Sequence, residues 1–89
     1  MNVTFSKKYE RQFDRLSSAK TRKQIVASVK SIIDANRLEE VPSIKKLKGF
    51  TNAYRVRSGH FRIGLIKEAD GTILIAAFDQ RKDFYDIFP

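Results

Sequence analysis

The chain has 89 residues, a net charge of +8 and 42% hydrophobic residues, a balance that fits one small folded domain and not a disordered tail. It has no cysteine and one histidine, His60, which excludes disulfides and thiolate metal sites and disfavours a Ser-His-Asp triad. No apolar run approaches the roughly 20 residues of a membrane span, and residues 1–6 do not resemble a secretory signal. We expect a single domain over residues 1–89, located in the cytoplasm, with no membrane contact, metal or cofactor.

The first half of the chain predicts a short strand and two helices. Asn2–Phe5 alternates as a strand does, and Ser6 is a suitable N-cap for a helix over Lys7–Leu16. Ser17-Ser18 offers a second N-cap for a longer helix that ends near Asn36. Apolar residues recur at helical spacing, which predicts one buried face on each helix: Tyr9, Phe13 and Leu16 on the first, and Ile25, Val26, Val29, Ile32 and Ile33 on the second. Two such helices form a helical hairpin.

The second half predicts a loop and three strands. Pro42 and Gly49 interrupt residues 37–52, for which we expect a loop with one helical turn. The strands cover Ala53–Arg57, Phe61–Lys67 and Ile73–Phe78, joined by turns at Ser58-Gly59 and Asp70-Gly71. The order of elements predicts an α+β fold in which a helical hairpin packs on an antiparallel sheet.

Positive charge is concentrated in the middle of the chain. Residues 41–67 contain seven basic side chains and no acidic one, so the cations have no partners nearby in sequence. Such a segment favours a polyanion, either a phosphate backbone or an acidic protein. Its loop carries Lys45, Lys46 and Lys48.

Strand alternation places the arginines on one face of the sheet. A turn at Ser58-Gly59 sets Arg55 opposite Arg62, and Arg57 and His60 fall on the same side. Like charges opposite each other destabilise a sheet, and rules broken locally often mark a functional site. Across the next turn Arg62 faces Asp79, Gly64 faces Ala77 and Ile66 faces Ile75. The small residues Gly64 and Ala77 would leave a depression beside the arginines, and a continuing strand would add Arg81 to a basic groove.

Three segments resemble the RelE/ParE superfamily of bacterial type II toxins. They are Leu47-Lys48-Gly49, the run Ala53-Tyr54-Arg55-Val56-Arg57-Ser58-Gly59-His60-Phe61-Arg62-Ile63, and Arg81-Lys82-Asp83-Phe84-Tyr85. The resemblance covers essentially the whole chain and implies the RelE-like fold, a helical hairpin on a curved antiparallel sheet. It also implies a partner, an acidic antitoxin that wraps around the toxin and blocks its groove.

For the RelE branch the resemblance implies metal-independent cleavage of messenger RNA in the ribosomal A site, by attack of a 2′-hydroxyl on the adjacent phosphate. Carried over by position, the catalytic candidates are Arg55, Arg57, Arg62, Arg81 and Tyr85. Arginine suits this role because its planar guanidinium can bind phosphate through two hydrogen bonds. Further candidates for contact with RNA are Lys45, Lys46, Lys48 and His60.

The chain departs from the family pattern where a general base is usual. RelE toxins often carry lysine at the positions of Arg55 and Arg57, and arginine stays protonated. Gln80 replaces the histidine that often precedes the last arginine, which leaves Tyr85 and His60 as titratable groups near the arginines. Two alternatives therefore stay open: a ParE-like inhibitor of DNA gyrase without enzymatic activity, and an inactive relative that binds RNA or antitoxin.

Overall fold

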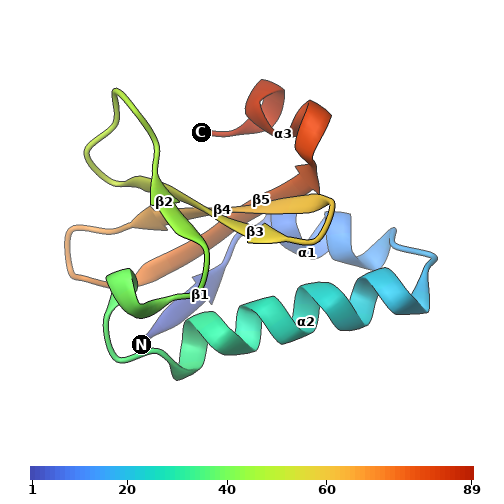
Figure 1. Ribbon diagram of the computed structural model, residues 1–89, viewed down its shortest axis with the longest axis horizontal. Coiled ribbons are helices and arrows are strands. Elements are labelled where there is room, and N and C mark those ends of the chain that lie inside the picture. Colours follow the sequence, from blue (N-terminus) through green and yellow to red (C-terminus); the bar gives the residue numbers. More distant parts are fainter.

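The computed structural model describes residues 1–89 and shows a five-stranded sheet with helices on both faces (Figure 1). The strands lie in the order β1-β5-β4-β3-β2, with β1 parallel to β5 and the other neighbours antiparallel. In chain order the elements are β1 (Val3–Phe5), α1 (Lys7–Asp14), α2 (Ala19–Asp34), the 3-10 turn η1 (Leu38–Glu40), β2 (Ile44–Lys46), β3 (Ala53–Ser58), β4 (Phe61–Lys67), β5 (Ile73–Gln80) and α3 (Arg81–Ile87). The predicted α+β class is confirmed. None of the three helices is long and apolar enough to cross a membrane.

Both predicted N-caps start the helices of the hairpin. The Ser6 hydroxyl accepts a hydrogen bond from the Tyr9 amide, and the Ser18 hydroxyl accepts one from the Thr21 amide. Both helices cover one face of the sheet, where their apolar side chains form the main core with β3, β4 and β5 (Figure 1). Val26 and Ile33 are 52% and 40% exposed, contrary to prediction. Each lies at the margin of the buried stripe of α2, one residue after a fully buried isoleucine.

Residues 37–52 contain a strand in addition to the predicted helical turn. The turn is η1, and β2 pairs antiparallel with β3, with Lys45 opposite Arg55. Sequence patterning missed β2 because it is a three-residue edge strand with a single apolar side chain, Ile44. Exposed lysines are typical of edge strands, since they discourage pairing with another chain.

The turn between β3 and β4 lies at Gly59-His60, one residue later than predicted. Gly59 has a φ of +60°, a conformation that favours glycine. Arg57 is therefore opposite Arg62, and Arg55 is opposite Gly64, so the predicted pair of Arg55 with Arg62 is wrong. The partner of each residue moves by two positions, and this keeps every side chain on its predicted face.

Between β4 and β5 the predicted register holds only as far as a β-bulge. Gly64 is opposite Ala77, as expected, but beyond an irregularity at Gly64/Leu65 the partner of Ile66 is Leu74 and not Ile75. The bulge lets Ile75 and Phe78 both enter the main core, and Ala76 packs on the other side of the sheet.

The C-terminal segment forms a helix instead of extending β5. Helix α3 starts at Arg81 and packs on the face of the sheet opposite α1 and α2 (Figure 1). Phe84 is fully buried and Phe88 is 5% exposed. The Phe88 ring lies so close to Gly64 that a Cβ on this glycine would be 2.7 Å from three ring carbons. The depression predicted at Gly64 and Ala77 is therefore filled by Phe88.

Candidate functional site: an arginine cluster beside helix α3

Four arginines meet on the face of the sheet that carries α3. Arg55 and Arg57 come from β3, and Arg62 comes from β4 directly opposite Arg57. Arg81 is the first residue of α3, and its amide donates a hydrogen bond of 2.8 Å to the His60 carbonyl. This bond ties the start of α3 to the β3–β4 turn. The prediction that these side chains share one face is thus confirmed for the strands, and Arg81 joins them from a helix.

Arg62 is the most buried member of the cluster, with 8% of its surface exposed. Its Nη1 donates hydrogen bonds to the carbonyls of Gly59 and Phe61, at 3.0 and 2.9 Å. Burial lowers the pKa of its guanidinium, and the charges of Arg55, Arg81 and Arg57 lower it further. These three charges repel the Arg62 guanidinium, and a bound anion would offset that repulsion.

No carboxylate neutralises the cluster. Asp79 is opposite Arg62 in the sheet, but its Oδ1 accepts a hydrogen bond from the Gln80 amide at 2.7 Å. The single ion pair of the protein joins Arg37 to Glu39 at 2.8 Å, outside this face. Because like charges are concentrated here without partners, the site can attract and hold a phosphate group.

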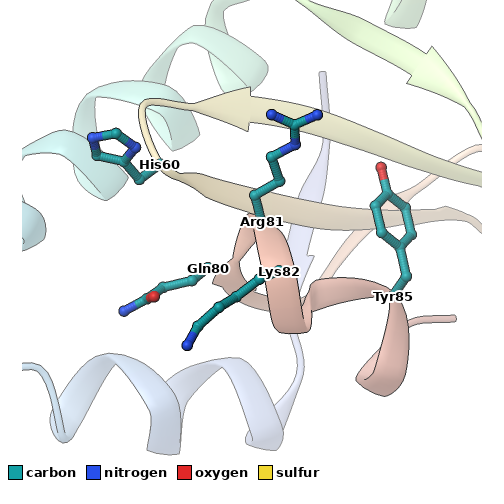
Figure 2. Close-up of a pocket in the computed structure, with 5 residues that line it drawn as sticks. All are labelled: His60, Gln80, Arg81, Lys82 and Tyr85. Carbon is teal, nitrogen blue, oxygen red and sulfur yellow. The ribbon is translucent and has the colours of Figure 1, made fainter.

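An open hollow of about 500 Å³ adjoins the cluster and is lined by His60, Gln80, Arg81, Lys82 and Tyr85. Figure 2 shows the Arg81 guanidinium and the Tyr85 hydroxyl extending to the same side of α3, whereas Gln80 and Lys82 extend to the other side. Residues four apart share one face of a helix, which explains this arrangement. Tyr85 is 56% exposed, and its ring meets the buried Phe84 ring edge-on at 5.0 Å. The Tyr85 ring therefore packs against Phe84 on one side, and more than half of its surface stays accessible to a ligand.

Comparison with known proteins gives the family. No family model matches the chain. Toxin RelE3 of Methanocaldococcus jannaschii is 34% identical to it, with both sequences covered in full. The chain belongs to the RelE family of toxins.

Solved structures agree with this assignment. The RelB–RelE antitoxin–toxin complex from Methanococcus jannaschii matches with a TM-score of 0.76 and 33% identity, over 98% of this chain and 100% of the other. The YoeB dimer of Staphylococcus aureus matches at 28% identity and a TM-score of 0.65, over 86% of this chain and 92% of the other. The isolated RelE toxin of E. coli, 15% identical over 89% of this chain and 82% of the other, has the same fold with a TM-score of 0.69.

The remaining predicted contact residues of this RelE toxin lie in different places. Lys45 is on the arginine face, opposite Arg55 in the sheet. Lys46 is opposite Tyr54 and lines a hollow with Leu38 and Glu39, on the side of the sheet that faces α1 and α2. Lys48 is exposed in the loop after β2, and His60 is exposed in the β3–β4 turn. The structure therefore brings one of the three lysines to the arginines.

Sequence reasoning missed Ser43, which lies in the turn directly before β2 and forms hydrogen bonds with β3. Its hydroxyl donates a hydrogen bond of 3.1 Å to the Arg57 carbonyl, and its own carbonyl accepts one of 3.4 Å from Arg55 Nη1. Ser43 is the one non-glycine residue with a positive φ, at 58°. A strained conformation of this kind is often found at functional sites. Nothing in the sequence pattern marks this serine, because the contact depends on the pairing of β2 with β3.

No group of three or more His, Cys, Asp or Glu side chains in the structure could hold a metal ion.

Proposed function

We propose that this RelE-family toxin is a ribosome-dependent endoribonuclease that cleaves messenger RNA in the A site. The observation that carries the proposal is the cluster of four arginines without a carboxylate partner, next to the exposed Tyr85 hydroxyl. A phosphodiester supplies the anion that such a cluster lacks, and an RNA base can stack on an exposed aromatic ring.

In the proposed reaction the 2′-hydroxyl attacks the phosphorus of its own 3′ phosphate. The bond from phosphorus to the 5′-oxygen breaks, and this oxygen takes up a proton in exchange for the one that the 2′-hydroxyl loses. The products are a 2′,3′-cyclic phosphate on one fragment and a 5′-hydroxyl on the other. Negative charge grows on the phosphate oxygens in the transition state, and fixed cations stabilise it. We assign the binding of the RNA phosphates, and this stabilisation, to the cluster of Arg55, Arg57, Arg62 and Arg81 as a whole.

Tyr85 is the group we assign to the proton transfer. Arginine stays protonated at neutral pH, so the proton of the 2′-hydroxyl must pass to another group. The Tyr85 hydroxyl extends to the same side of α3 as the Arg81 guanidinium (Figure 2), and a hydroxyl can both accept and donate a proton.

Two features support an acidic antitoxin as the protein partner. The net charge of +8 is concentrated on residues 41–67, which favours an acidic surface. The similar structure from Methanococcus jannaschii is a RelB–RelE antitoxin–toxin complex. We expect a neighbouring reading frame to encode a short acidic protein that copurifies with this toxin and suppresses its activity.

The test is translation of a reporter message in a cell-free extract with added toxin. We expect cuts in phase with the codons, with 5′-hydroxyl ends, and their loss in the Arg81→Ala variant. Normal full-length product with no cuts would refute the proposal. Inhibition of DNA gyrase supercoiling by the same preparation would then assign the protein to the ParE-like alternative.

A further inference from the structure

The arginine face has a second hollow, separate from the one beside Tyr85. It has a volume of about 300 Å³ and is lined by Ser43, Ile44, Lys45, Arg55 and Arg57. Lys45 and Arg55 are direct partners across β2 and β3, so their side chains leave the sheet on the same face. Arg57 lies at the inner border of this hollow, opposite Arg62. The hollow thus extends the cluster toward the β2 edge of the sheet.

The walls of this hollow are fixed by hydrogen bonds from side chains to backbone carbonyls. Arg55 Nη1 donates to the Ser43 carbonyl, and the Ser43 hydroxyl donates to the Arg57 carbonyl. These bonds connect β2 to β3 through a residue in a left-handed conformation, where serine is less favourable than glycine. The bond to the Ser43 carbonyl holds the Arg55 side chain at the wall of the hollow, and an arginine held in this way loses less entropy when it binds a ligand.

The charges in the hollow have no internal counter-ion. No acidic residue occurs between residues 41 and 67, and neither Lys45 nor Arg55 forms an ion pair. Alternate side chains on one strand are separated by about 6.8 Å, which is comparable to the spacing of successive phosphates along an extended nucleic-acid strand. An RNA whose reacting phosphate lies between Arg62 and Arg81 could place a neighbouring phosphate here.

We propose that Ser43, Lys45, Arg55 and Arg57 form a phosphate subsite that binds a non-reacting phosphate of the RNA, next to the one that is cleaved. This inference rests on the proposed ribonuclease function, and it assigns different residues to the reacting and the non-reacting phosphate. Arg62, Arg81 and Tyr85 act on the reacting phosphate. Lys45 and Arg55 hold the strand in position, Arg57 borders both sites, and Ser43 is a positioning residue.

The test compares Lys45→Ala with Lys67→Ala as a control of equal charge. Lys67 is an exposed lysine on β4, and its side chain lies on the opposite side of the sheet. Binding to a short, fully 2′-O-methylated single-stranded RNA, which this reaction cannot cleave, is measured by fluorescence anisotropy at several salt concentrations. We expect Lys45→Ala to weaken binding several-fold and to reduce the slope of log affinity against log salt by about 0.7, the value for one phosphate contact on a single strand. Lys67→Ala should change neither quantity.

Ser43→Gly separates positioning from charge. Glycine tolerates the positive φ, and the substitution removes the hydroxyl that holds the Arg57 carbonyl. We expect weaker RNA binding with the salt slope unchanged, because no cation is lost. A purely structural serine would leave the affinity at the wild-type value.

Cleavage on ribosomes supplies the second measurement. Lys45→Ala should raise the toxin concentration needed for half-maximal cleavage several-fold and leave the maximal rate unchanged, whereas Arg81→Ala should lower the maximal rate. Equal affinity and salt slope for Lys45→Ala and Lys67→Ala would overturn the subsite, whatever the cleavage result. Absence of cleavage by the wild-type toxin would overturn the ribonuclease function, and the binding data would still decide whether the subsite exists.

Discussion

Replacing Gly64 with alanine tests whether Phe88 fixes the C-terminal segment on the sheet. The new Cβ would lie 2.7 Å from Cγ, Cδ1 and Cδ2 of the Phe88 ring, whereas ordinary contacts begin at about 3.4 Å. The ring must therefore move out of a position in which it is 5% exposed. Overpacking of this kind costs about 1–3 kcal/mol, and the better strand propensity of alanine returns about 0.5–1 kcal/mol. We expect a net loss of about 1 kcal/mol in the free energy of unfolding.

A double-mutant cycle identifies the contact responsible. Phe88→Ala alone should cost about 3–5 kcal/mol, since it removes a buried aromatic ring. In that background Gly64→Ala should be neutral or stabilising, because the clash is gone and a strand glycine has been removed. Urea unfolding followed by circular dichroism gives all four free energies. Additive effects of the two substitutions would refute the contact, since residues that clash must be coupled.

The same substitution has a functional consequence. Phe88 follows the helix that carries Arg81 and Tyr85, so a displaced ring loosens both side chains. We expect Gly64→Ala to slow RNA cleavage more than its stability loss explains, in an assay run well below the unfolding transition. Wild-type cleavage by a folded Gly64→Ala protein would show that the position of α3 does not depend on this contact.

Further substitutions separate folding from activity. Arg81→Ala should reduce cleavage by about a hundredfold. Because this side chain is exposed, the free energy of unfolding should change by less than about 0.5 kcal/mol. A destabilised Arg81→Ala protein would contradict this assignment. Arg62→Ala should also reduce cleavage. In addition it should lower the free energy of unfolding, measured in urea, by about 1–3 kcal/mol, since the Gly59 and Phe61 carbonyls lose their donor. Unchanged stability would show that these bonds contribute nothing. Burial raises the pKa of Tyr9, so the neutral phenol stabilises the fold at any pH below the ordinary value of 10.0, and this stability is lost as the pH rises through the raised pKa. Tyr9→Phe should remove that loss, and thermal midpoints of both proteins falling in parallel through the alkaline range would contradict the argument.

Sequence reasoning was most successful where structure depends on local interactions. The caps at Ser6 and Ser18 are side chains bonding to amides three residues later, and both are readable in the sequence. The shared face of Arg55, Arg57 and Arg62 was also predictable, because strand alternation has a period of two. A one-residue error in the turn changed the partner of each residue by two positions and left the face unchanged.

Contacts between distant parts of the chain could not be predicted in this way. The pairing of β2 with β3 places Ser43 beside Arg57, and no periodic pattern marks such a short strand. The sequence predicts a depression at Gly64, whereas the close approach of the Phe88 ring requires a residue without a side chain there. The charge and the arginine face are thus properties of the sequence. Tertiary structure alone decides three features: the depression filled by Phe88, the helix that carries Arg81 and Tyr85, and the second hollow. They depend on how the strands and the last helix pack, and the packing free energy is a sum over residues far apart in the chain.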